Sequence, residues 1–204
     1  MKKLELKKTL KYLYEPSPSD FSVVEVPSLN FIMVDGTGNP NTSAEYVDAL
    51  QALYGVAYTL KFKIKKEMEV DYPVMASEGL WWMDDMREFS ATRKDDWKWT
   101  MMIMQPEIVS PQLFSQAVNE LSKKKELPAL PKLRLEQFHE GLAVQILYFG
   151  AYADEGPTIS RMHKFIEETG NVRFGKHHEI YLGDPRRSAP EKLRTVIRQP
   201  MRKK

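Results

Sequence analysis

The sequence has no cysteine among its 204 residues. A disulfide framework, a thiolate nucleophile and a zinc site with cysteine ligands are therefore excluded. The chain also lacks any apolar run of about 18 residues, the length that a membrane-spanning helix requires. Lysines interrupt the first segment where a signal peptide would have its apolar core. We therefore expect a cytoplasmic protein with no membrane partner.

The chain also has little net charge. Its 30 lysines and arginines stand against 28 aspartates and glutamates, which gives a formal net charge of +2 at pH 7. Binding to nucleic acid depends on a concentrated excess of positive charge, so we do not expect nucleic acid as a partner. The glycine-rich residues 35–38 lack the Gly-Lys-Ser/Thr ending of a phosphate-binding loop and are predicted to form a turn.

Large polarisable side chains are frequent. The sequence contains four tryptophans, nine tyrosines, nine phenylalanines and eleven methionines. Such residues fill hydrophobic cores, and they also line sites for flat aromatic ligands. Their positions relative to the carboxylates decide between these two uses.

The first half of the chain alternates short β-type runs with helical patterns. Thr42 stands three residues before Glu45, which is the spacing of a capping box at the start of a long amphipathic helix. Ser110 and Pro111 mark the start of a second helix, as its cap and first helical position. The strands that we predict in this half are residues 21–26, 29–34, 70–83 and 97–105.

The second half repeats this order of elements after a linker at residues 127–131. A helix opens at Pro157 and ends at Gly170. Its predicted strands are residues 133–138, 142–149, 177–182 and 195–199.

We therefore predict an α+β fold of two βαββ halves, with antiparallel sheets and with helices on one face. The predicted divisions are an N-terminal arm at 1–20 and one domain at 21–204, with halves at about 21–126 and 132–200.

Four segments resemble proteins of the GyrI-like small-molecule-binding family. The closing segment reads KHHEIYLGDPR at residues 176–186, and GAY at residues 150–152 is similar to the family's entry into its second helix. Residues 78–82 (EGLWW) and 97–99 (WKW) are similar to the stand-alone branch of the family. The resemblance covers roughly residues 20 to 200.

The resemblance implies two βαββ halves related by a pseudo-twofold axis, with a ligand cleft between them. Family members include effector-binding domains of multidrug-responsive regulators and a gyrase inhibitor. Some free-standing members resemble cyclopropanoid cyclopropyl hydrolases, which open the strained ring of spirocyclopropyl-cyclohexadienone alkylators without a cofactor. The segment before Phe21 is too short for a helix-turn-helix domain, which disfavours a regulator.

Strand alternation divides the closing motif between two faces. His177, Glu179 and Tyr181 share one face, while Ile180 and His178 share the other. We expect Ile180 to pack against the helices, so that Glu179 and Tyr181 face a ligand cleft on the opposite side. Adjacent strand residues point apart, so the two histidines and Glu179 do not converge on a metal, and we expect none.

The remaining candidates lie on neighbouring strands. By the same alternation, Glu78 shares a face with Trp82 and is expected to take the part symmetric to Glu179. The alternation does not decide whether Trp81 or Trp82 lines the cleft. Tyr152 lies in the family's GAY segment. The further predicted ligand contacts are Trp82, Trp99, Met101, Tyr148, His177 and Tyr181.

These residue types suit acid–base chemistry on a flat aromatic compound. We expect Glu179 to direct the attacking water, and Glu78 or Tyr152 to donate to the ligand oxygen, although the roles could be exchanged. The predicted ligand is a planar aromatic or cationic small molecule. A non-catalytic sequestering or sensing module uses the same residue types, and a protein-interaction role is a third reading. We expect a monomer or a weak dimer.

Overall fold

The computed structural model describes residues 1–86, 89, 92–185 and 187–204. Arg186 of the closing motif and part of the loop between residues 84 and 96 lie outside the described residues. The helices are α1 (Leu6–Thr9), α2 (Lys11–Tyr14), α3 (Ala44–Met68), α4 (Pro111–Ser122) and α5 (Gly156–Glu168). The strands are β1 (Lys2–Lys3), β2 (Ser22–Thr37), β3 (Val70–Asp71), β4 (Ser77–Trp82), β5 (Lys98–Gln105), β6 (Arg134–Phe149), β7 (Asn171–Arg173), β8 (His177–Tyr181) and β9 (Arg194–Lys203).

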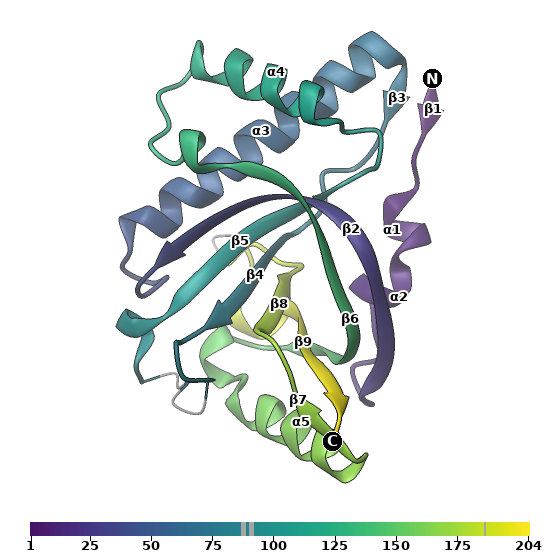
Figure 1. Cartoon of the computed structure of the whole chain (residues 1–204), viewed down its shortest axis with the longest axis vertical. Coiled ribbons are helices and arrows are strands. Elements are labelled where there is room, and N and C mark those ends of the chain that lie inside the picture. The colour runs from purple at the N-terminus through teal and green to yellow at the C-terminus, as the bar shows by residue number, and fades with distance from the viewer. Residues whose placement is uncertain (87–88, 90–91, 186) are drawn as a thin grey trace.

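The main sheet closes on itself. Its described strands are antiparallel and follow the order β6-β2-β5-β4-β8-β9-β7, and β6 also pairs with β9. The result is a barrel-like sheet with α3 and α4 at one end of the molecule and α5 at the other (Figure 1). The expectation of a separate sheet for each half is wrong, because β2 pairs with β6 and β4 pairs with β8.

Two long strands replace two predicted pairs of short ones. β2 and β6 each span 16 residues. Residues 27–28 and 139–141 lie between the predicted short strands, but β2 and β6 pair with each other across them, from Ser22↔Gln145 to Met33↔Arg134. Pro27 has no partner in this register, so its missing N–H removes no ladder bond. In each half a long strand and a helix are followed by three strands and not two, because the short β3 and β7 precede the predicted pairs. A duplication of the halves stays a prediction.

The long helix α3 begins one residue later than predicted. Its cap is Ser43 and not Thr42, because the Ser43 hydroxyl accepts a hydrogen bond from the Tyr46 amide. The helix ends at Met68, and its C-cap residue Glu69 has a left-handed φ of 56°. The predicted cap of α4 is confirmed, since Ser110 accepts from the Leu113 amide. No helix within the described residues has both the length and the apolar composition that a membrane crossing demands.

Helices α3 and α5 cover the same face of the sheet. Tyr46 of α3 packs on Trp81 and Trp99, and α5 packs Met162 against a cluster that includes Ile197. Trp81 is opposite Trp99 and next to the β8 strand, while Ile197 is opposite Glu179. We call this side of the sheet the helix face; its members include Trp81, Trp99, Glu179 and Ile197.

The N-terminal arm covers the opposite side of the sheet. Leu13 and Tyr14 of α2 are buried, and Tyr14 contacts Glu78. Strand β1 anchors the start of the arm by pairing in parallel with β3. We call this second side the arm face; its members include Glu78, His178, Ile180 and Arg198.

Trp99 fits the helix face because its neighbour across the sheet is a glycine. A Cβ built on Gly36 would lie 2.1 Å from Cη2 of the Trp99 ring, far inside van der Waals contact. Trp99 itself is fully buried. The glycine therefore provides the space that the indole fills.

We expect Gly36→Ala to lower the free energy of unfolding by about 1–3 kcal/mol, because the new methyl group overpacks the Trp99 ring. Urea denaturation measures this change. The matched control is Gly156→Ala, where a Cβ meets nothing within 4 Å. The control should change stability by less than about 0.5 kcal/mol. Equal effects of the two substitutions would contradict the proposed packing.

Candidate functional site

Glu179 lies at the centre of a hydrogen-bonded group on the helix face. His177 Nε2 is 3.0 Å from one carboxylate oxygen, and the Tyr181 hydroxyl donates to the other at 2.8 Å. The Trp81 indole N–H in turn donates to the Tyr181 oxygen at 2.9 Å. Both oxygens of Glu179 are thus held in place, while 15% of its side chain stays exposed.

The predicted alternation along β8 is confirmed, but its relation to the helices is wrong. His177, Glu179 and Tyr181 do share a face, and Ile180 lies on the other one. Helices α3 and α5 pack on the face that carries Glu179, whereas Ile180 lies on the arm face, where Tyr14 of the arm contacts the neighbouring Glu78. Alternation determines which side chains share a face, but it does not determine which element packs there.

Glu155 is a second carboxyl group at this site, and the sequence did not single it out. It directly precedes α5, and only 2% of the residue is exposed. Burial and then the charge of Glu179 raise the pKa of Glu155 to about 9. Burial alone would also raise the pKa of Glu179, but the hydrogen bond and charge of His177, with the Tyr181 hydroxyl, lower it instead.

The two carboxyl groups therefore differ in protonation at neutral pH. Glu155 keeps its proton because its pKa is raised, while the lowered pKa of Glu179 leaves that group ionised. Its Oε1 atom is buried and has no hydrogen-bond partner among the described residues. A neutral acid beside an ionised one is the arrangement that general acid–base catalysis requires.

Aromatic rings surround the two acids. Tyr152 meets Tyr181 edge to face at a centroid distance of 5.4 Å, and Trp81 meets Trp97 at 5.4 Å. Phe89 stacks on Trp97 at 4.9 Å. We call this set the aromatic cluster; it consists of Tyr46, Trp81, Phe89, Trp97, Tyr152 and Tyr181.

The two adjacent tryptophans lie on opposite faces of the sheet. Trp81 belongs to the helix face, which also carries Glu179. Trp82 lies on the other face, so its position does not support the prediction that Trp82 contacts the ligand. Trp82 points to the arm face, where the Lys176 ammonium lies 3.4 Å from its ring centroid. The β4–β8 register causes this, because it sets Trp81 opposite His177.

The other predicted contacts surround or support the cluster. Trp99 and Met101 lie on the helix face but are fully buried beneath it, and His177 is 3% exposed. Tyr152 belongs to the cluster; burial, with the charges of Glu155 and Glu179, raises its pKa to about 12. The Tyr148 hydroxyl donates to the Ala151 carbonyl at 3.4 Å, close to the segment that carries Tyr152.

Glu78 does not join Glu179. The register places Gly79, and not Glu78, opposite Glu179, so the two carboxylates lie on opposite faces of the sheet. The glycine leaves space for the Trp81 indole, whose Nε1 would lie 2.6 Å from a Cβ at this position. The expected convergence of Glu78 and Glu179 is therefore wrong.

Glu78 instead belongs to a buried ionic network on the arm face. His178 Nε2 is 2.9 Å from Glu78, and its Nδ1 is 2.9 Å from Glu140. Arg198 donates to Glu140 at 3.0 Å and to the Leu13 carbonyl at 2.7 Å, which ties the arm to the sheet. Two carboxylates that each accept from one ring nitrogen require both nitrogens to be protonated.

The pKa values in this network agree with that charge state. Burial opposes charging of His178, but the charge and hydrogen bonds of Glu140 and Glu78 raise its pKa to about 9. Burial also opposes ionisation of Glu140, yet His178 and Arg198 lower its pKa to about 2. The network is therefore a compensated set of buried charges. Across the described residues, no group of three or more His, Asp or Glu side chains is arranged to hold a metal ion.

Comparison with known proteins supplies the family. The model of the GyrI-like small molecule binding domain matches residues 19–202 of this chain. The chain belongs to the GyrI-like family. The comparison with curated proteins yields no match.

Several solved structures resemble this GyrI-like protein. A hydrolase from Listeria innocua is 35% identical, with a TM-score of 0.88, and the match covers 98% of this chain and 100% of that one. An uncharacterized conserved protein from the same organism is 36% identical, with a TM-score of 0.90 and the same coverage. The C-terminal domain of EcmrR, at 11% identity and a TM-score of 0.56, covers 91% of this chain and 98% of that one and shares the fold.

The raised pKa of His178 predicts how stability depends on pH. The folded protein holds the proton more tightly than the unfolded chain, so the stabilisation is complete below the ordinary value of 6.5 and is lost as pH rises through about 9. Relative to His178→Gln, we expect the wild type to lose on the order of 3 kcal/mol of unfolding free energy over this interval. Urea denaturation at each pH measures the difference. A difference that is flat with pH would mean that His178 is neutral.

Proposed function

We propose that this protein is a cofactor-independent hydrolase of planar compounds with a strained ring, of the spirocyclopropyl-cyclohexadienone type. The observation that carries the proposal is the pairing of ionised Glu179 with protonated Glu155 beside the aromatic cluster. The similarity over the whole chain to a protein named as a hydrolase also supports it.

The proposed reaction adds one water molecule. The water oxygen bonds to a methylene carbon of the cyclopropane, and the bond from that carbon to the spiro carbon breaks. The released electron pair enters the dienone ring, which becomes an aromatic phenol as its oxygen takes up a proton. Glu179 accepts the proton from water, and Glu155 gives its proton to the dienone oxygen. Transfer of a proton from Glu179 to Glu155 restores the starting state.

The two acids suit these roles for a physical reason. With a pKa of about 9, Glu155 keeps its proton at neutral pH, and its Oε1 has no partner among the described residues. Glu179 stays ionised because His177 and Tyr181 donate to it. Tyr152 is the alternative donor to the dienone oxygen, since its ring contacts Tyr181. The aromatic rings would stack on the flat ligand, at about 1 kcal/mol for each contact beyond area burial.

A second candidate function is sequestration or sensing of a planar cation. Ionised Glu179 among aromatic rings favours a delocalised positive charge, through both ion pairing and cation–π attraction. A binding module of this kind would hold the ligand without changing it. Turnover therefore distinguishes the two candidates.

The decisive assay incubates the purified protein with a spirocyclopropyl-cyclohexadienone and follows the product by mass. We expect the wild type to form, with many turnovers, a product heavier by one water. Glu179→Gln and Glu155→Gln should each slow the reaction by about 100-fold or more, because each removes one proton-transfer group. The matched control is Glu168→Gln, an exposed glutamate at the end of α5, which should leave the rate unchanged.

Stoichiometric binding without turnover would contradict the hydrolase and favour the sequestering module. Turnover that is unchanged in both Glu179→Gln and Glu155→Gln would place the chemistry elsewhere. Circular dichroism of each variant verifies that a lost rate does not come from lost folding.

A further inference from the structure

One face of helix α5 leads away from the Glu179 site. Residues spaced by four lie on this face, and they are Glu155, Ile159, His163 and Glu167. Glu155 already has helical backbone angles, and its carbonyl accepts from the Ile159 amide at 3.0 Å. The three residues that follow Glu155 in this row line a pocket. The row therefore connects the proposed acid with that pocket.

The pocket has a volume of about 450 Å³ and lies between α5 and the segment that runs from β7 to the start of β8. We call it the α5–β7 pocket. Two groups of the Glu179 site also line it. His177, whose Nε2 lies 3.0 Å from Glu179, is one of them, and Phe89 of the aromatic cluster is the other. The centroids of these two rings are 6.1 Å apart. The pocket and the Glu179 site therefore share a wall.

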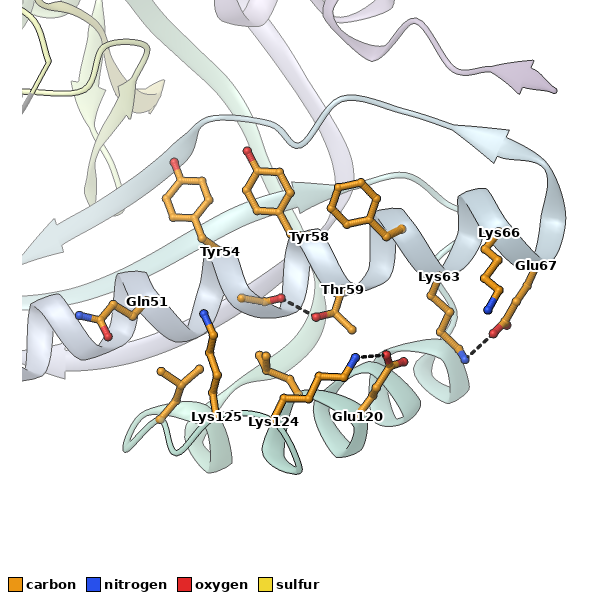
Figure 2. Close-up of a pocket in the computed structure, with 14 residues that line it drawn as sticks. Gln51, Tyr54, Tyr58, Thr59, Lys63, Lys66, Glu67, Glu120, Lys124 and Lys125 are labelled. Atoms are coloured by element: carbon orange, nitrogen blue, oxygen red, sulfur yellow. Dashed lines mark hydrogen bonds and ion pairs between the residues drawn. The ribbon is translucent and has the colours of Figure 1, made fainter.

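A larger groove lies at the other end of the molecule, between α3 and α4, and has a volume of about 760 Å³. Figure 2 shows that the Tyr54 and Tyr58 rings point away from α4, and so out of the space between the two helices. As far as the structure describes the chain, the lining of this α3–α4 groove includes no member of the Glu179 site. It therefore provides control positions for a test of the α5–β7 pocket.

The charges that line the α5–β7 pocket balance among its described residues. Arg173 and Glu167 carry opposite charges. Burial, with the charges of Arg173 and His177, lowers the pKa of His163 to about 4, so His163 is neutral at pH 7. The Arg173 guanidinium donates to His163 Nδ1 at 3.2 Å, since a guanidinium can only donate. A lining of this kind favours a neutral group over an ion.

Apolar side chains form another part of the lining. They are Ile159 on α5, Val172 on β7 and Phe174 directly after β7. Phe174 is 50% exposed, and the guanidinium carbon of Arg202 lies 4.9 Å from its ring centroid. An exposed ring beside aliphatic side chains in a concave space is suited to an aromatic group of a ligand.

We propose that the α5–β7 pocket holds a second, neutral aromatic unit of the same ligand whose reactive unit lies beside Glu179. The ligand is then an elongated molecule of two linked ring systems, and Ile159 and Phe174 determine the preference for its second unit. The shared wall of His177 and Phe89 favours one continuous ligand over a separate effector molecule. This inference rests on the proposed ligand site at Glu179.

The test compares two probes, 2-naphthol and 6-phenyl-2-naphthol, by isothermal titration calorimetry on the full chain. Both carry the phenol group that the proposed reaction forms, and neither has a strained ring, so their binding does not depend on turnover. We expect the wild type to bind the longer probe about tenfold or more tightly, because its phenyl ring is buried in the pocket. Phe174→Ser should reduce this affinity ratio by about two- to tenfold. Ile159→Trp, which fills the pocket, should abolish the ratio and leave 2-naphthol binding unchanged.

The matched control is Phe62→Ser, which removes a phenylalanine of similar exposure, 59%, from the α3–α4 groove and should leave the ratio unchanged. Glu179→Gln should weaken both probes by the same factor, because it acts on the end that they share. Equal affinities in the wild type, a ratio lost in Phe62→Ser but kept in Phe174→Ser, or simultaneous binding of both probes would overturn the proposal. The expected ratio without turnover of the spirocyclopropyl compound would support the pocket and contradict the hydrolase alone.

Discussion

The antiparallel register between β4 and β8 determines the chemistry of both faces of this sheet. It sets Gly79 opposite Glu179 and Leu80 opposite His178. The small residue at position 79 leaves room for the Trp81 indole, which donates to the hydroxyl that holds Glu179. A shift of this register by one residue would exchange the faces, and the two groups of acids would meet different neighbours.

The two faces use buried acids in different ways. On the arm face, Glu78, His178, Glu140 and Arg198 form a network in which each charge has a partner, and Arg198 also holds the arm. Removal of one member would leave an uncompensated buried charge, which is strongly destabilising. On the helix face, Glu155 is neutral and Glu179 is ionised and partly exposed. The first arrangement suits structure, and the second combines a neutral acid with an ionised one, as the proposed reaction needs.

Local patterns in the sequence predicted much of this molecule. Alternation correctly placed His177, Glu179 and Tyr181 on one face, and Ser110 was correctly predicted as a helix cap. The sequence could not show which face the arm or the helices cover, since that depends on packing between segments far apart in the chain. For the same reason, the prediction that Glu78 lies on the same side of the sheet as Glu179 was wrong. Residues 27–28 and 139–141 were predicted to separate short strands, but the pairing between β2 and β6 continues across them.

Glu155 is a residue of the candidate site that the sequence motifs did not predict. Glu155 follows the family's GAY segment, three residues after Tyr152. Its raised pKa depends on burial beside Glu179, which the spacing of residues in the sequence does not reveal. The sequence also did not predict Trp97 and Phe89 as members of the aromatic cluster. Both belong to the segment between β4 and β5, and their contacts with the cluster depend on how this segment folds back.

The unequal protonation of Glu155 and Glu179 can be measured directly by NMR titration of protein labelled with ¹³C at the glutamate carboxyl carbon. Glu155→Gln and Glu179→Gln assign the two signals. We expect the Glu155 signal to titrate at about 9 and the Glu179 signal below its ordinary value of 4.5. Two signals that both titrate near 4.5 would mean that the carboxyl groups do not share a proton, and the proposed acid–base pair would be wrong.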